Sequence, residues 1–426
     1  MSNSKGLLAL SPLLAFIALY LVTSIVVRDF YKVPIAIAFL ISCVYAIGKR
    51  RKESLESRID VFTEGASDKG IMQMLWIFIL AGAFANVAKD IGSIDATVNL
   101  ILSLLPQSLV LPGLFFATCF VSLSIGTSVG TIVALVPIAA GLATSMGASV
   151  PLVTAVVVGG AFFGDNLSFI SDTTIAATNS QNCNMSDKFK VNIFIALPAA
   201  VIVLAIYCFI GFNLQSPAVA GQTDIIKVLP YLAVLITAMV GVNVYTVLVV
   251  GVALAFCIGL FDGSHDVFAL LHSMGDGVLS MSELIIITIL AGGLFGLVKH
   301  DGGIDYIIEK ITRLVKGKRG AELVICALVA AVDVCTANNT VAIITVGGIA
   351  QRISKVFHVD NRRVASLLDT SSCIMQGIIP YGAQMLMASS LAHLNPLDIM
   401  PYLYYPFVLS VFVLGSIVFR FPKRYS

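Results

Sequence analysis

The stretch Gly164-Asp165-Asn166-Leu167-Ser168-Phe169-Ile170-Ser171-Asp172-Thr173-Thr174 decides the fold. It interrupts an apolar run that begins at Pro151 and resumes at Ile175. Carboxylates inside such a run are expensive in hydrocarbon, so they normally face a bundle interior or a water-filled cavity. A helix that breaks at this depth leaves backbone groups unpaired, which is tolerated only where they line a site. The stretch therefore predicts a broken membrane helix near 151–178 with a polar site at its break.

The composition places the rest of the chain in the membrane. Of 426 residues, 58% are hydrophobic and only 12% are charged, whereas a soluble chain has about 25% charged residues. Several apolar runs of roughly 18 or more residues match transmembrane helices. The sequence thus predicts an all-α polytopic membrane protein embedded in a lipid bilayer.

Other classes of protein have little support. The net charge is +2, and no basic stripe suggests a nucleic-acid partner. The eight cysteines show no zinc-site spacing, and we expect no cofactor. An enzyme would need a nucleophile–base pair or a motif such as HExxH, and a channel would need repeated filter motifs. We find none of these patterns, so we do not expect an enzyme.

An internal duplication organises the chain. Leu80-Ala81-Gly82 recurs as Leu290-Ala291-Gly292, and further matches follow in the same order. They include Lys89 with Lys299, Thr127 with Thr336, Thr131 with Thr340, Asp165 with Asp369 and Ser168 with Ser372. An ordered series with slowly drifting spacing indicates a true repeat. We assign residues 1–215 to the first copy and residues 216–426 to the second.

Each copy contains a pair of short apolar runs around a polar tip. The pairs lie near 109–145 and 321–350, and their runs are short for a span, which needs about 20 residues. We therefore expect two re-entrant hairpins, together with about 10 transmembrane helices. A second broken helix should lie near 364–390. An odd number of spans per copy inverts the second copy, as in many secondary transporters.

The distribution of cations indicates the orientation. With the N-terminus inside, the cationic segments 49–52, 310–319, 352–363 and 420–424 fall on the cytoplasmic side, as do Lys188 and Lys190. This arrangement agrees with the positive-inside rule. We expect a bacterial inner (plasma) membrane protein with both termini in the cytoplasm.

Four carboxylates should lie at membrane depth: Asp165, Asp172, Asp333 and Asp369. Their own segments contain no lysine or arginine, so each acid should be protonated or neutralised by a bound cation. Two structural alternatives remain open. Asp369 is close to Arg362 and Arg363 and could pair with one of them, and Asp333 could cap the second arm of its hairpin.

The surroundings of these acids are rich in oxygen, which hard monovalent cations prefer. A Na⁺ ion could be held by Asp165, Thr127, Ser168 and Asn338. Intramembrane hydroxyls also bond to their own helix, which is the alternative for any single one of them. The residues that we expect to line the site are Gly126, Thr127, Ser128, Thr131, Asn166, Ser168, Thr336, Asn338, Asn339, Thr340, Ser372 and Gln376.

The motif at 164–174, preceded by Gly-Ala-Phe-Phe, resembles the signature of the NhaC family of Na⁺/H⁺ antiporters within the ion transporter superfamily. The resemblance extends through both repeats. It implies a secondary active exchanger with a midplane site. It also implies that Ser171, Thr173 and Thr174 line that site together with Asp165, Ser168 and Asp172.

The sequence departs from the family pattern at several positions. Position 166 is Asn where many members carry Lys, and position 169 is Phe where Pro is usual. The second broken helix reads Ile379-Pro380-Tyr381-Gly382, where a Pro-Trp-Asn run is common. These departures bear on the transported species more than on the class of transporter.

Two transport functions remain after this comparison. The first exchanges Na⁺ for H⁺ by alternating access, with Asp165 as the shared carboxylate. The second moves a small organic acid or amino acid coupled to Na⁺ or H⁺, with Asn338, Asn339, Gln376 and Tyr381 contacting the solute. The sequence leaves the oligomeric state open, including a homodimer.

Overall fold

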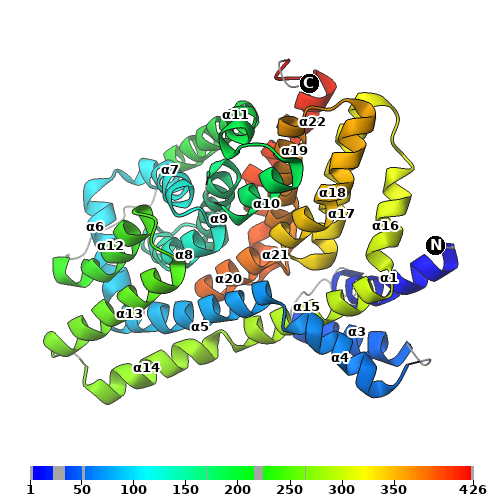
Figure 1. Cartoon of the computed structure of the whole chain (residues 1–426). Helices are drawn as coiled ribbons and strands as arrows, with labels where there is room; N and C mark the ends of the chain where they lie inside the picture. Colours follow the sequence, from blue (N-terminus) through cyan, green and yellow to red (C-terminus); the bar gives the residue numbers. More distant parts are fainter. Residues whose placement is uncertain are drawn as a thin grey trace.

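Every regular element in the described part of the chain is a helix (Figure 1). The computed structural model describes residues 3–22, 34–49, 53–169, 171–214, 224–263 and 265–423. Part of the cationic segment 49–52 and Arg424 lie outside these ranges. The prediction of an all-α polytopic membrane protein is confirmed.

The first half runs from an N-terminal helix to a long helix that ends at Phe212. Its elements are α1 (Asn3–Ile17), η1 (Ala18–Val22), α3 (Ile35–Lys49), α4 (Leu55–Ala66), α5 (Lys69–Asp90), α6 (Ser93–Leu104), α7 (Gln107–Ile125), α8 (Ser128–Met146), α9 (Val150–Leu167), α10 (Asp172–Gln181) and α11 (Met185–Phe212).

The second half repeats this order of helices. Its elements are α12 (Ile225–Met239), α13 (Val244–Phe261), α14 (Val267–Ser280), α15 (Ser282–His300), α16 (Gly303–Thr312), α17 (Gly317–Thr336), α18 (Asn339–Phe357), α19 (Asn361–Ile378), α20 (Ala383–Ala392), α21 (Pro396–Ile399), η2 (Met400–Tyr402) and α22 (Tyr404–Val418).

Eight described helices, or helix pairs that follow closely on each other, are long and apolar enough to cross a membrane. A bent pair, Pro396–Tyr402 with Tyr404–Val418, would be a ninth, with 53° between its parts. Two helices were absent from the sequence prediction. Helix α4 leads directly into α5, and α14 leads directly into α15. Figure 1 shows these two pairs along the lower edge of the molecule.

The arms of the expected hairpins are longer than their apolar runs. Helices α7 and α8 have 19 residues each, and α17 and α18 have 20 and 19. At 1.5 Å per residue each arm is about 28–30 Å long, close to the hydrocarbon thickness. Length alone therefore no longer favours hairpins over full spans, and the count of ten spans and two hairpins stays a prediction.

Both broken helices are interrupted where polar or proline-containing sequence predicts. Helix α9 ends at Leu167, and Ser171 caps α10 by accepting a hydrogen bond from the Thr174 amide (3.2 Å). Helix α19 ends at Ile378, and α20 begins at Ala383 after Pro380, which has no backbone N–H to donate. The breaks place the open ends of four helices inside the bundle, where α10 packs against α18 and α20 packs against α8.

Close packing positions the first break against its neighbour. A side chain at Gly164 would place its Cβ 2.3 Å from Ser122 Cβ and 2.4 Å from the Leu123 nitrogen on α7. Gly126, which was expected to line the site, ends α7 with a φ of 73°, a conformation that glycine adopts without a steric cost. Its role in the structure is that of the backbone turn between α7 and α8.

Candidate functional site

The centre of the site is the first break, between α9 and α10. Ser171 Oγ donates to the Asp165 carbonyl (2.9 Å), and Thr174 Oγ1 donates to the Ser168 carbonyl (2.8 Å). These bonds satisfy carbonyls that the interrupted helix cannot pair. The break is therefore stabilised by its own hydroxyls, as expected for a built site rather than a distorted span.

A lysine ammonium lies at this break. Lys188, in the first turn of α11, is only 1% exposed. Its Nζ is 2.5 Å from Asp369 Oδ2 on α19. The same nitrogen donates to the Asn166 carbonyl (2.5 Å) and to Thr174 Oγ1 (2.6 Å). Three oxygens of different chemical type, from three helices, thus enclose one positive charge.

Asn192, one turn further along α11, completes the surroundings of Asp369. Its Nδ2 donates to Asp369 Oδ2 (3.2 Å) and to the Asn166 side-chain oxygen (2.8 Å). The Thr173 hydroxyl also interacts with Asp369. The second carboxylate oxygen, Asp369 Oδ1, is buried and has no hydrogen-bond partner in the described part of the chain.

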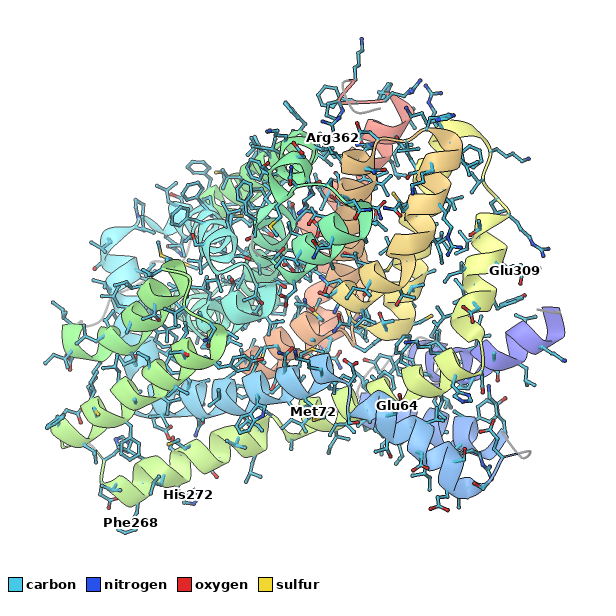
Figure 2. The ribbon with its side chains drawn as sticks, in the orientation of Figure 1. Glu64, Met72, Phe268, His272, Glu309 and Arg362 are labelled. Atoms are coloured by element: carbon cyan, nitrogen blue, oxygen red, sulfur yellow. The ribbon has the colours of Figure 1, made fainter. Side chains whose placement is uncertain are left out.

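The expectation that the deep acids lack a basic partner is wrong for Asp369. Lys188, which the sequence groups with the cytoplasmic cations, has its side chain buried in the bundle. The side of the membrane on which it lies stays a prediction. The alternative pairing of Asp369 with an arginine is wrong as well. Arg362 pairs with Asp360 (2.6 Å), and Arg363 pairs with Glu322 (3.4 Å). Figure 2 shows Arg362 at the beginning of α19, near the C-terminal segment.

Asp165 is the second buried acid of the site. It is 5% exposed, and its Oδ2 accepts a hydrogen bond from Ser128 Oγ on α8 (2.9 Å). Its carboxyl interacts electrostatically with both Asp369 and Lys188. The structure therefore brings Asp165, Asp369 and Lys188 into one cluster with a net charge of one negative unit when both acids are ionised.

Ser128 links Asp165 to the second half of the chain. Gln384 Nε2 on α20 donates to Ser128 Oγ (3.0 Å), and Gln376 Nε2 on α19 donates to Gln384 Oε1 (2.8 Å). Gln376 Nε2 also donates to the Ala337 carbonyl at the end of α17 (3.0 Å). A continuous chain of hydrogen bonds thus connects both broken helices with both tips.

Asp172 does not join this cluster. It is the first residue of α10, and its side chain is exposed. It lies close enough to Asp165 and to Tyr245 for an electrostatic interaction. Its predicted role in ion binding stays a prediction.

Several predicted lining hydroxyls bond to nearby backbone instead of facing a ligand. Thr131 Oγ1 donates to the Thr127 carbonyl (2.9 Å), and Ser372 Oγ donates to the Asp369 carbonyl (2.9 Å). Thr336 Oγ1 donates to the Asn338 carbonyl (3.1 Å). This is the usual behaviour of intramembrane Ser and Thr. The carbonyls of Thr127 and Asp369 each accept a hydrogen bond from one of these hydroxyls. The hydroxyl oxygens are therefore less available to coordinate a cation.

The second tip faces a cavity of about 460 Å³. Asn338 caps α18 by accepting from the Val341 amide (3.1 Å), and Asn339 Oδ1 accepts from the Thr340 amide (3.1 Å). The tip residues on the cavity wall are Thr336, Ala337 and Asn338. The charged side chains on the wall are Glu64, Asp68 and Lys299, and His300 lies beside them. Figure 2 shows Glu64 near the junction of α4 and α5. Asn338 therefore belongs to this side of the molecule, and no described contact joins it to Asp165.

Three residues of the site were missed from the sequence: Lys188, Asn192 and Gln384. A signal for the first two exists in the spacing of α11. Lys188, Asn192 and Ala196 recur every four residues, and all three are buried. This spacing places them on one face of a helix that begins directly after a three-residue turn.

Nearly the whole chain matches one family model. The model of the Na⁺/H⁺ antiporter family matches residues 4–212 and 220–421. The chain belongs to the Na⁺/H⁺ antiporter family. This confirms the resemblance drawn from the motif at 164–174, and it agrees with the expectation of a multi-pass membrane transporter.

Curated relatives are distant but cover most of the chain. The chain is 22% identical to the Na⁺/H⁺ antiporter NhaC of Bacillus subtilis, over 84% of this chain and 85% of the relative. It is 21% identical to the malate-2H⁺/Na⁺-lactate antiporter of the same organism, over 89% and 88%. Among solved structures, the YdaH transporter of Alcanivorax borkumensis matches with a TM-score of 0.42 and 14% identity, over 86% and 88%.

The structure shows which residue lies beside position 166, where this Na⁺/H⁺ antiporter family member departs from the family pattern. Asn166 stands where the family resemblance leads us to expect a lysine. Here the ammonium of Lys188 reaches the Asn166 carbonyl from α11. In this chain α11 therefore supplies a positive charge beside position 166.

Proposed function

We propose that the protein exchanges Na⁺ for H⁺ across the membrane at the cluster of Asp165, Asp369 and Lys188. The observation that carries the proposal is the enclosure of the Lys188 ammonium by oxygens of Asp369, Asn166 and Thr174 at 2.5–2.6 Å. Carboxylate, carbonyl and hydroxyl oxygens are also the ligands of hard cations. The site thus already accommodates a monovalent cation.

The charge of the cluster supports exchange rather than co-transport. Two aspartates and one lysine leave one uncompensated negative charge in a buried site, and such a charge must be neutralised. One proton on Asp165 neutralises it, and so does one Na⁺ beside Asp165 and the unpartnered Asp369 Oδ1. Because either cation is sufficient, binding of one disfavours binding of the other. Each half-cycle then carries only one of them.

The two-fold organisation of the helices supports alternating access by two inverted repeats, 1–215 and 216–426. Helices α9 and α19 have 18 residues each, and α10 and α20 have 10 residues each. Gly92 and Gly302, which precede α6 and α16, have φ angles of 78° and 77°. We propose that α7–α8 and α17–α18 are the moving hairpins, in a bacterial inner membrane with both termini cytoplasmic.

A second candidate function rests on the 460 Å³ cavity at the second tip. It is large enough for a small organic solute, and its wall carries charges of both signs. This candidate is also supported by the similarity of the chain to a malate-2H⁺/Na⁺-lactate antiporter. An organic acid or amino acid would then bind at Asn338 and Tyr381 and move with Na⁺ or H⁺.

Sealed proteoliposomes with an internal pH dye separate the two candidates. Na⁺ alone should drive proton movement through the native protein, whereas K⁺ should not. Asp165→Asn should abolish the response. If Na⁺ alone has no effect while a carboxylate or an amino acid gives coupled flux, the Na⁺/H⁺ proposal is wrong and the organic-solute proposal replaces it.

A further inference from the structure

We propose that Asp333 and Gln376 hold a second hard monovalent cation, Na⁺ or H⁺, at a site distinct from the Asp165–Asp369–Lys188 cluster. The proposal rests on the transport function proposed above. Both residues belong to the second repeat: Asp333 lies in the last turn of α17, and Gln376 lies in the last turn of α19.

Asp333 is a carboxyl group without a countercharge. It is fully buried (0% exposed), and neither of its oxygens has a hydrogen-bond partner in the described ranges. The backbone of Gln376 lies near it and interacts with its carboxyl. The alternative role of capping α18 is filled by Asn338. An ionised carboxylate cannot remain buried without a cation or proton, so Asp333 needs a ligand that the described side chains do not supply.

Gln376 presents a third unpartnered acceptor. Its Oε1 is buried and has no donor, while its Nε2 donates to the Ala337 carbonyl and to Gln384 Oε1. The network fixes this orientation. Ser128 donates to the Asp165 carboxylate, so it must accept from Gln384 Nε2. Gln384 Oε1 then faces Gln376, which must turn its Nε2 towards it. The side-chain atom of Gln376 that has no partner is therefore the amide oxygen Oε1, a hydrogen-bond acceptor.

The two residues are neighbours through the end of α17. The Ala337 amide donates to the Asp333 carbonyl (2.7 Å), and the Ala337 carbonyl accepts from Gln376 Nε2 (3.0 Å). Three buried oxygens that lack donors are thus assembled around one turn of backbone. Oxygens of carboxylate and amide groups are the ligands that hard cations choose.

The cavity at the second tip supplies a route to this site. Ala337 and Tyr381 line its wall, and Tyr381 Oη donates to the Val334 carbonyl (2.7 Å), next to Asp333. Asp333 interacts electrostatically with Tyr381. The carboxyl therefore lies behind the inner wall of this cavity, while the first cluster lies at the other end of the Ser128–Gln384–Gln376 chain.

Two counts on the purified protein in detergent test the proposal. The first is the number of ²²Na⁺ ions bound at saturation, and the second is the number of protons released per Na⁺ bound in weakly buffered solution. If Asp333 holds Na⁺, the native protein binds two Na⁺, and both Asp333→Asn and Gln376→Leu bind one. If Asp333 holds a proton that leaves when Na⁺ binds, the native protein binds one Na⁺, and both variants release fewer protons per Na⁺ bound.

Matched controls are Asp305→Asn, which makes the same chemical change on an exposed residue of α16, and Gln351→Leu on α18. Monodisperse elution establishes that each variant is folded. Two bound Na⁺ ions in the native protein support the proposal only where both variants lose one of them. The proposal is overturned if both variants keep the native counts of Na⁺ and protons, whether the native protein binds one Na⁺ or two. That result would leave exchange at Asp165 intact, whereas loss of Na⁺-driven flux in the native protein would overturn the first proposal alone.

Discussion

Replacement of Lys188 by methionine tests how the buried charges are balanced. The substitution keeps an unbranched apolar chain and removes the ammonium. It leaves Asp369 without its countercharge and removes the hydrogen bonds that Lys188 donates to the Asn166 carbonyl and to the Thr174 hydroxyl. Asn192 Nδ2 still donates to that carbonyl (3.0 Å), and Ser171 Oγ to that hydroxyl (2.9 Å). Removing one partner of a buried ion pair lowers the free energy of unfolding by about 3–5 kcal/mol. In Na⁺-free buffer we therefore expect Lys188→Met to be much less stable than the native protein.

Na⁺ should recover part of that loss, because it can replace the ammonium among the same oxygens. A ligand at about 100 times its Kd stabilises the folded state by about 2.7 kcal/mol. The assay is thermal unfolding in detergent over a series of NaCl concentrations, with choline chloride as the ionic-strength control. The melting temperature of Lys188→Met should rise more steeply with Na⁺ than that of the native protein.

The matched control is Lys190→Met on the same helix. The Lys190 side chain is 61% exposed and lies 3.6 Å from Asp187, and an exposed pair contributes only about 0–1 kcal/mol. This variant should unfold like the native protein, with the native response to Na⁺. Equal unfolding curves for Lys188→Met and Lys190→Met would refute the reasoning.

Three further substitutions probe the surroundings of the site. Ser128→Ala removes a hydrogen bond to the Asp165 carboxylate that should be worth about 1.5–3 kcal/mol. Protons then compete better with Na⁺ for Asp165, and the Na⁺ concentration for half-maximal exchange should rise about 10-fold or more. An unchanged concentration would show that Asp165 is not the acid for which the two cations compete. Glu322→Gln leaves the buried Arg363 without its acidic partner and should lower the free energy of unfolding by about 3–5 kcal/mol. The rise of the melting temperature with Na⁺ should be the same as in the native protein. A changed response to Na⁺ would mean that this ion pair belongs to the site. The Arg362 guanidinium holds the pKa of Asp360 below its usual range, so the capping contribution of Asp360 to α19 is present at neutral pH and is lost as the pH falls through that lowered pKa. Asp360→Ala should lose about 1 kcal/mol at pH 7, and a loss that stays the same as the pH is lowered into the acid range would contradict the account.

The membrane fold and the first break were predictable because their signals are local. Apolar runs, the polar interruption at 164–174 and Pro380 each act on their own stretch of backbone. Asp165 was predictable for the same reason, since an acid within an apolar run needs a functional explanation. The family resemblance rests on that same stretch, and the match over nearly the whole chain confirms it.

The partner of Asp369 was not predictable by the same reasoning. Lys188 follows a short turn and stands next to Asp187 and Lys190, so it reads as part of a charged loop. Only the four-residue spacing to Asn192 and Ala196 indicates that it faces inward. The pairing joins α11 to α19 over a long stretch of chain, and a single sequence gives no information on which distant residues meet.

The hydroxyls illustrate a different difficulty. Thr131, Thr336 and Ser372 have the composition of a cation site, but each donates to a nearby backbone carbonyl. Composition does not distinguish a hydroxyl that faces a ligand from one that satisfies its own helix. The lengths of α7, α8, α17 and α18 similarly exceed their apolar runs, because their ends include polar residues that hydropathy excludes.

The central claim is that Na⁺ and H⁺ compete for one uncompensated negative charge at Asp165. The most direct test measures the apparent Kd for Na⁺ of the purified protein at a series of pH values, for the native chain and for Asp165→Asn. We expect the native Kd to rise about tenfold for each unit by which the pH falls in the acidic part of the range, since one proton displaces one Na⁺. Asp165→Asn should lose this dependence. A native Kd that does not change with pH would contradict the claim.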